Sequence, residues 1–127
     1  MRNMLIIVAV IAAIFTLAGV SSKNAPSLTF ATVSSSVQKK RAHLYDVRTP
    51  EEFKAGHFAG ATNWPLQDMQ AGKLPDVPKD AKIYVYCRSG NRSGQATTLL
   101  KSAGYSNVTD LRGLSDVQNM GGKLLTH

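Results

Sequence analysis

Short runs of β-branched and aromatic residues alternate with helix-like stretches along most of the chain, and this alternation constrains the fold more than any other feature. Strands are expected at 43–47, 61–64, 82–86 and 107–111, with a further short edge strand at 28–30. Helices are expected at 32–41, 49–56, 66–71, 93–103 and 114–120. Strands joined by helical stretches of about ten residues form parallel sheets, because the crossover returns the chain to the same end. The sequence therefore predicts a three-layer α/β fold, with a mostly parallel central sheet and helices on both faces.

The strongest predicted strand ends directly at the single cysteine of the chain. Residues 82–86 read Lys-Ile-Tyr-Val-Tyr, Cys87 follows, and a short polar loop leads into a predicted helix. Cys87 is thus expected at the carboxyl edge of a parallel sheet, where α/β proteins bind ligands. A short turn before a helix directs several backbone N–H groups at one point, and the helix dipole adds positive potential there.

Two arginines strengthen this prediction, because Arg88 and Arg92 lie in the loop that follows the cysteine. Positive surroundings lower the pKa of a cysteine thiol from its usual value of about 8.5. We therefore expect Cys87 to be a reactive thiolate and the loop to bind an anionic group.

The composition excludes several classes of site and partner. A single cysteine cannot build an internal disulfide framework or a multi-cysteine metal site, and the three scattered histidines argue against a histidine metal site. No cofactor is expected. The net charge is +7, from 15 Lys and Arg against 8 Asp and Glu. The basic residues are scattered and no nucleic-acid motif accompanies them, so we expect no nucleic-acid partner and instead a small anionic substrate attracted by the excess charge.

The N-terminal segment reads as an export signal rather than as part of the fold. Arg2 precedes sixteen uncharged, mostly apolar residues at 5–20. A positive start followed by an apolar run is the pattern of a secretory signal. The run is slightly long for the apolar region of such a signal, and it is short for a membrane span, which needs about 20 residues. We expect a cleaved signal at 1–22, a linker at 23–27 and a bacterial periplasmic protein. The alternative is an uncleaved anchor that holds the protein at the inner membrane, facing the periplasm, and only then is a membrane a partner.

Two motifs resemble the single-domain rhodanese family. Residues 87–93, Cys-Arg-Ser-Gly-Asn-Arg-Ser, are similar to the active-site loop of that family. Residues 44–53, Leu-Tyr-Asp-Val-Arg-Thr-Pro-Glu-Glu-Phe, and 56–63, Gly-His-Phe-Ala-Gly-Ala-Thr-Asn, resemble its other signature. The resemblance covers about 28–120 and implies a rhodanese-like domain at 28–127.

The resemblance implies a thiosulfate sulfurtransferase with Cys87 as its catalytic residue. The Cys87 thiolate would take the outer sulfur of thiosulfate or another persulfide donor, release sulfite, and pass the sulfur to cyanide or to a thiol, including a protein thiol. Arg88 and Arg92 would bind the anionic end of the donor. Ser89, Gly90 and Asn91 would form the cradle around the sulfur.

Two alternatives stay open. In one, the chain is a persulfide carrier or binding module that works only with a partner protein. In the other, it is a relative of the cysteine phosphatases or arsenate reductases. Related phosphatases place five residues between the cysteine and the arginine of their loop, whereas four separate Cys87 from Arg92 here. This spacing argues against phosphate chemistry.

The last segment departs from the pattern of the family, which has two glycines and then a tryptophan. Arg112 stands for the first glycine, and Val117 stands where the tryptophan would fall. We expect Val117 to leave space around the last helix unless neighbours fill it. Arg112 is a candidate for additional anion binding at the mouth of the site. Asp46 and Arg48 flank the end of a strand, and we expect a structural ion pair or turn hydrogen bond there rather than acid–base catalysis.

Overall fold

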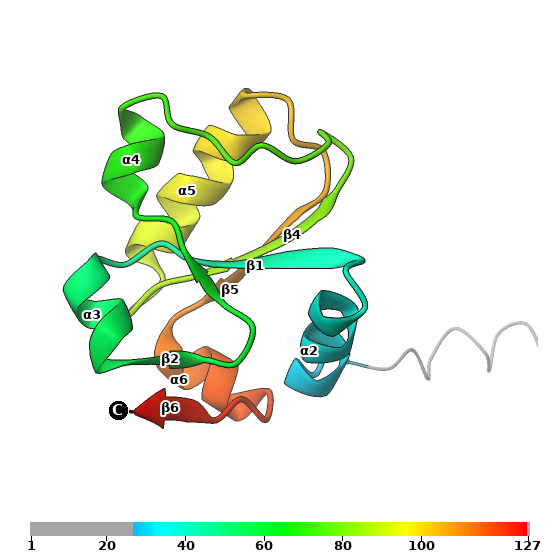
Figure 1. Ribbon diagram of the computed structural model, residues 1–127, viewed down its shortest axis with the longest axis vertical. Helices are drawn as coiled ribbons and strands as arrows, with labels where there is room; N and C mark the ends of the chain where they lie inside the picture. Colours follow the sequence, from blue (N-terminus) through cyan, green and yellow to red (C-terminus); the bar gives the residue numbers. More distant parts are fainter. Residues whose placement is uncertain (1–26, 127) are drawn as a thin grey trace, which may run out of the picture.

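The central sheet has four parallel strands in the order β3-β1-β4-β5, as seen in a computed structural model that describes residues 27–126 (Figure 1). The strands are β1 (Ala42–Asp46), β3 (Thr62–Asn63), β4 (Lys82–Tyr86) and β5 (Val108–Arg112). The predicted parallel sheet is therefore confirmed. The predicted signal or anchor at 1–22 and most of the linker lie outside the described residues.

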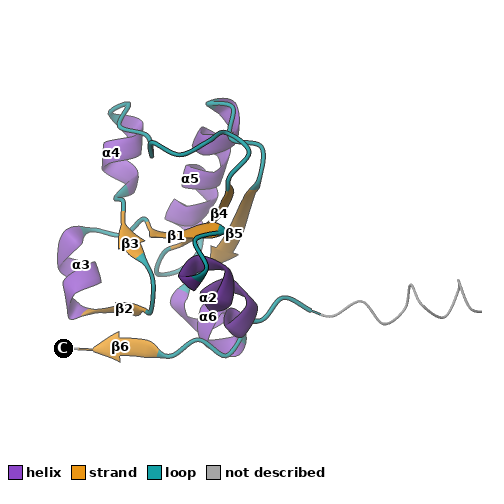
Figure 2. Cartoon of the chain, turned by 45° about the vertical axis from the view of Figure 1, so that its right-hand side comes forward, coloured by secondary structure: helices purple, strands orange, loops and turns teal. Residues whose placement is uncertain are grey.

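Alternating side chains of the strands build one apolar cluster on each face of the sheet. One cluster includes Tyr45, Val47, Ile83, Val85 and Val108, and the other includes Ala42, Leu44, Tyr84, Tyr86 and Leu111. Helices α4 (Leu66–Gln70) and α5 (Asn91–Ser102) cover the first face, while α2 (Phe30–Gln38) and α6 (Leu114–Asn119) cover the second (Figure 2). The predicted three layers are confirmed.

Helix α3 (Pro50–Ala55) begins where the sequence predicts, because Thr49 and Glu52 form a capping box. The Thr49 hydroxyl accepts the Glu52 N–H at 3.3 Å, and the Glu52 carboxylate accepts the Thr49 N–H at 3.3 Å. These bonds satisfy backbone groups that the first turn of a helix leaves unpaired.

The expected edge strand at 28–30 is wrong. Phe30 is instead the first residue of α2, and the hydroxyl of Thr29 caps this helix by accepting the Thr32 N–H at 3.3 Å. A threonine cap favours a helix start over continued extended backbone. The three serines that follow did not prevent the helix.

A second, two-stranded antiparallel sheet was not predicted. It pairs β2 (Gly56–Phe58) with β6 (Leu124–Thr126), which brings the C-terminal end of the described chain beside α3 (Figure 1). Strands of three residues carry too little periodicity to be found from sequence. Their pairing also joins segments from opposite halves of the chain.

Neighbouring backbone packs against Val117, where the sequence left open whether neighbours would fill the place of the missing tryptophan. The Val117 side chain is fully buried, and the backbone of Gly122 packs directly against it. A Cβ atom at Gly122 would lie 2.8 Å from Val117 Cγ1 and 3.1 Å from a ring carbon of Phe58. The chain after α6 therefore fills the volume that a larger side chain would occupy.

Candidate active site

Cys87 directly follows β4, at the carboxyl edge of the parallel sheet. Its backbone N–H donates to the Arg112 carbonyl at 2.8 Å, which fixes the end of β4 against the end of β5. The sulfur accepts a hydrogen bond from the Gly90 N–H at 3.0 Å. The Cys87 thiol donates to Ser93 Oγ at 3.4 Å. The loop thus closes over the sulfur with one backbone N–H aimed at it.

The conformation of Gly90 makes this contact available. Gly90 has φ +101° and is the N-cap of α5, so its N–H turns back toward Cys87. Only glycine adopts this backbone without a steric penalty. The N-terminus of a twelve-residue helix therefore begins beside the sulfur, where its dipole favours negative charge.

The Cys87 side chain has no exposed surface, and it belongs to the same apolar cluster as Val85 and Ala96. Sequence reasoning placed the cysteine at the correct edge, but it did not foresee that its side chain is fully buried. A reagent can therefore reach the sulfur only if residues around Cys87 move.

Arg92 is held by an ion pair that the sequence did not predict. Its two terminal nitrogens donate to the two carboxylate oxygens of Glu52, at 2.6 and 3.0 Å. The hydrogen bonds from Arg92 lower the pKa of the Glu52 carboxyl from 4.5 to about 2. The capping box at Thr49 signals that Glu52 starts a helix, but no local pattern links it to an arginine forty residues away.

The other predicted loop residues present their side chains differently. Arg88, Ser89 and Asn91 are exposed, and Asn91 accepts a hydrogen bond from Gln95 on the next turn of α5. The Arg88 carbonyl accepts the Leu114 N–H at 3.0 Å, which ties the loop to the start of α6. Within residues 27–126, no carboxylate lies within ion-pairing distance of Arg88.

Asp46 and Arg48 form the structural ion pair that the sequence predicts. Arg48 Nη2 lies 2.6 Å from Asp46 Oδ2, and both side chains are almost completely buried. The same nitrogen donates to the Gly56 carbonyl at 2.6 Å, which joins the end of β1 to β2. Both Asp46 oxygens and the Nε and Nη2 atoms of Arg48 are used in hydrogen bonds that hold the chain, which supports a structural role for the pair.

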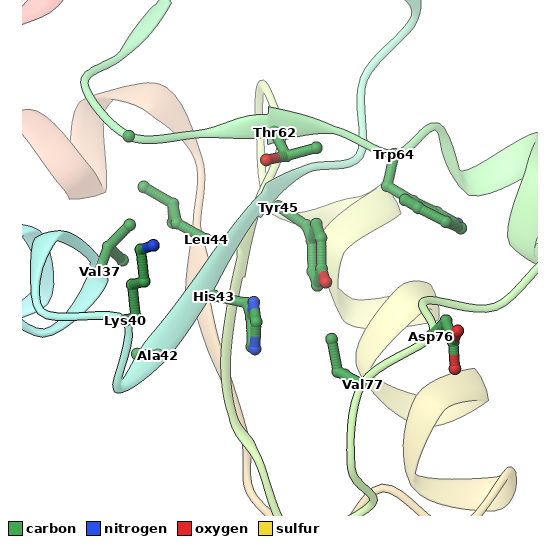
Figure 3. A pocket seen from close by; sticks show the side chains of 11 residues that line it. Val37, Lys40, Ala42, His43, Leu44, Tyr45, Thr62, Trp64, Asp76 and Val77 are labelled. Atoms are coloured by element: carbon green, nitrogen blue, oxygen red, sulfur yellow. The ribbon is translucent and has the colours of Figure 1, made fainter.

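Three hollows bear on how ligands could approach. One, of about 510 Å³, lies beside β1 and β3 and is lined in part by His43, Tyr45 and Trp64 (Figure 3). It includes no residue of the loop at 87–92. A smaller hollow, of about 210 Å³, is bounded by Arg92, Leu66 and other residues around the start of α4. The smaller hollow reaches the cysteine loop at Arg92, and a further hollow of about 510 Å³ between α4 and α5 reaches it at Asn91.

The described part of the chain offers no site for a metal ion, since none of its His, Cys, Asp or Glu residues gather in groups of three or more. No helix within 27–126 has the length and apolar character needed to cross a membrane.

Comparison with known proteins agrees with this geometry. Residues 29–116 match the rhodanese-like domain family. The chain is 40% identical over 76 residues to thiosulfate sulfurtransferase PspE of Escherichia coli, covering 59% of this chain and 73% of that protein. It is 40% identical over 70 residues to a sulfurtransferase of Allochromatium vinosum, covering 55% of this chain and 64% of that protein.

A solved structure supports the same assignment. The structure described as a rhodanese with anions from E. coli superposes with a TM-score of 0.56 at 35% identity, covering 68% of this chain and 99% of that one. Because the family match spans more than half of the sequence and the fold agrees, the chain belongs to the rhodanese-like domain family.

Proposed function

We propose that this protein is a thiosulfate sulfurtransferase that carries sulfur as a persulfide on Cys87. The family and the relatives named as sulfurtransferases support sulfur transfer in general. The observation that carries the finer proposal is the Gly90 N–H on the Cys87 sulfur at 3.0 Å, at the N-terminus of α5. This arrangement stabilises negative charge on the Cys87 sulfur, both in the attacking thiolate and in the thiolate that is released when the acceptor takes the outer sulfur.

The reaction runs in two balanced half-reactions. The Cys87 thiolate attacks the outer sulfur of thiosulfate, the S–S bond of the donor breaks, and sulfite leaves with the bonding electron pair. Cyanide or a thiolate then attacks the outer sulfur of the Cys87 persulfide. Thiocyanate or a new persulfide leaves, and the Cys87 thiolate returns, so no external oxidant or reductant is consumed.

The loop has a defined part in this reaction. The backbone of Ser89, Gly90 and Asn91 surrounds the added sulfur, while Arg88 and Arg92 attract the anionic end of the donor. The hollow of about 210 Å³ beside Arg92 is the approach route for small anions. Because the sulfur is fully buried, the loop from Ser89 to Asn91 moves outward to admit the donor.

Steady-state kinetics with thiosulfate and cyanide test the proposal. Covalent transfer through one residue gives parallel double-reciprocal plots, since the first product leaves before the second substrate binds. Cys87→Ser is expected to abolish turnover while its circular dichroism and unfolding midpoint stay close to those of the parent. Retained turnover in that variant would remove Cys87 from the mechanism. Intersecting plots would exclude a persulfide that outlives the first product.

A second candidate function is a persulfide carrier that exchanges sulfur only with a partner protein. One observation favours it, namely that the Cys87 sulfur has no exposed surface in the isolated chain. A partner that displaces the loop would then control access. This candidate predicts no turnover of thiosulfate by the protein alone.

A further inference from the structure

Arg112 occupies a backbone conformation that a residue with a side chain rarely adopts. Its φ is +73°, and within residues 27–126 only one other non-glycine residue, Lys40, has a positive φ. The pairing of β4 with β5 shifts register here, so that Val85 faces Asp110 and Tyr86 faces Arg112. A bulge of this kind re-aims a side chain and is frequent beside active sites. The Asp110 carboxylate accepts the Arg112 N–H at 2.8 Å and helps to hold the turn.

This bulge lies against the cysteine loop. The Arg112 carbonyl accepts the Cys87 N–H at 2.8 Å, and Ser93 Oγ lies 3.4 Å from the same carbonyl. A Cβ atom at Gly90 would lie 3.5 Å from Arg112 Cβ. The Arg112 side chain therefore leaves the backbone next to the residue whose N–H contacts the sulfur. It is exposed to solvent.

Some arginines around the loop are paired with a carboxylate, and others are not. Arg92 gives both terminal nitrogens to Glu52, and Arg48 is buried against Asp46. Within the described chain, no carboxylate lies within ion-pairing distance of the guanidinium groups of Arg88 and Arg112. Arg112 is thus an uncompensated cation at the rim, placed by a strained backbone that glycine would relieve.

We propose that Arg112 is a specificity-determining residue that binds the anionic end of the sulfur donor and favours dianionic donors over less charged ones. This inference rests on the proposed sulfurtransferase function and deepens it. Arg92 shares its charge with Glu52, so Arg112 adds to the attraction by Arg88 and Arg92 a charge that has no carboxylate partner among residues 27–126.

Arg112→Gly separates this role from a structural one, because glycine fits the positive φ and keeps the backbone. The matched control is Lys40→Gly, which also removes one positive charge at a positive φ, of +58°, but lies before β1 at the opposite end of the strands. We expect the KM for thiosulfate to rise about fivefold in Arg112→Gly, with kcat changed by less than about twofold. Arg112→Lys should restore most of the lost affinity, and Lys40→Gly should leave KM unchanged.

Donor charge provides the second comparison. Methanethiosulfonate offers the same outer sulfur on a monoanion, so Arg112→Gly should lower the preference for thiosulfate over methanethiosulfonate by about threefold. Unchanged KM and preference in Arg112→Gly, with normal turnover by the parent protein, would overturn the inference and leave the sulfurtransferase proposal intact. Equal losses in Arg112→Gly and Lys40→Gly would also overturn it, since they would reflect only net charge.

A measurement without turnover keeps the two proposals apart. Alkylation of Cys87 by anionic iodoacetate and by neutral iodoacetamide reports local charge whether or not sulfur is transferred. The rate with iodoacetate divided by the rate with iodoacetamide should fall about threefold in Arg112→Gly and should stay as in the parent protein in Lys40→Gly. If the parent protein fails to turn over thiosulfate, a fall in this ratio still supports the anion-binding role of Arg112, and a constant ratio refutes it.

Discussion

The ion pair of Arg92 and Glu52 connects the two sequence motifs, since Glu52 lies in the motif at 44–53 and Arg92 in the motif at 87–93. Arg92 comes from the cysteine loop and Glu52 from the first turn of α3. Thr49 Oγ1 also donates to Glu52 Oε1 at 3.1 Å, so the carboxylate is held from both sides. The pair therefore couples the position of the loop to the start of a neighbouring helix.

Glu52→Gln tests the strength of this coupling. The pKa of Glu52 is about 2, against an ordinary 4.5, chiefly because Arg92 hydrogen-bonds the carboxylate. A carboxyl whose pKa is lowered by folding stabilises the folded state fully when the pH is above the pKa of that carboxyl in the unfolded chain. This stabilisation is lost as the pH falls from about 4.5 to about 2. Because the pair is partly exposed, we expect Glu52→Gln to lower the free energy of unfolding by about 1 kcal/mol at pH 7.

Urea unfolding at several pH values checks this expectation. The difference between Glu52→Gln and the parent should shrink as the pH falls from about 4.5 toward 2, since the parent then loses the charge as well. Glu51→Gln is the control, because Glu51 is exposed on the same turn, and its effect should stay below about 0.5 kcal/mol. If the difference in the free energy of unfolding between Glu52→Gln and the parent does not change with pH, the ion pair makes no measurable contribution to stability.

At the scale of elements, the N-terminus of α5 and the loop before it form one unit with β4. Cys87 directly follows β4, Gly90 caps α5, and Ser93 on the first turn of α5 donates to the Gly90 carbonyl at 3.1 Å. The sulfur thus lies between a strand end and a helix start. The geometry of the site depends on Gly90, whose left-handed backbone leads from the end of β4 into α5.

Gly90→Ala is expected to damage the site more than the fold. An alanine at φ +101° is strained and should lower the free energy of unfolding by about 1 kcal/mol. Gly72→Ala is the matched control, since Gly72 has φ +89° and open space around it. Both variants should lose similar stability, while kcat/KM for thiosulfate should fall at least about tenfold only in Gly90→Ala, because its N–H moves off the sulfur. Equal activity in the two variants would contradict this role for the Gly90 N–H.

The elements also show what the sequence could predict. Strand β4 lies at 82–86 as predicted, because a β-branched and aromatic run bounded by a lysine and a loop is a strong strand signal. The start of α3 followed from its Thr-Pro-Glu-Glu sequence. The sheet of β2 and β6, the start of α2 at Phe30, and the ion pair of Arg92 with Glu52 were missed. The small sheet and the ion pair depend on contacts between distant segments, whereas the α2 start depends on a local threonine cap that was not recognised.

At the scale of the whole molecule, the parallel sheet separates two apolar clusters and leaves the chemistry at one edge. The cluster under α4 and α5 includes Cys87, so the sulfur of the proposed catalytic residue belongs to a packed core. Burial of this kind fixes the sulfur and excludes water, but it makes access dependent on the loop. The net charge of +7 favours encounters with anions, and in the proposed mechanism Arg112 concentrates that preference at the rim of the site.

The most direct test of the account is the intact mass of the purified protein after incubation with thiosulfate, before and after cyanide. The account predicts a gain of about 32 Da, one sulfur atom, located on Cys87 and removed by cyanide with formation of thiocyanate. The same spectrum reports whether the predicted signal at 1–22 has been removed. No adduct on a folded protein with a free Cys87 would contradict thiosulfate as the donor and favour a carrier that acts only with a partner protein.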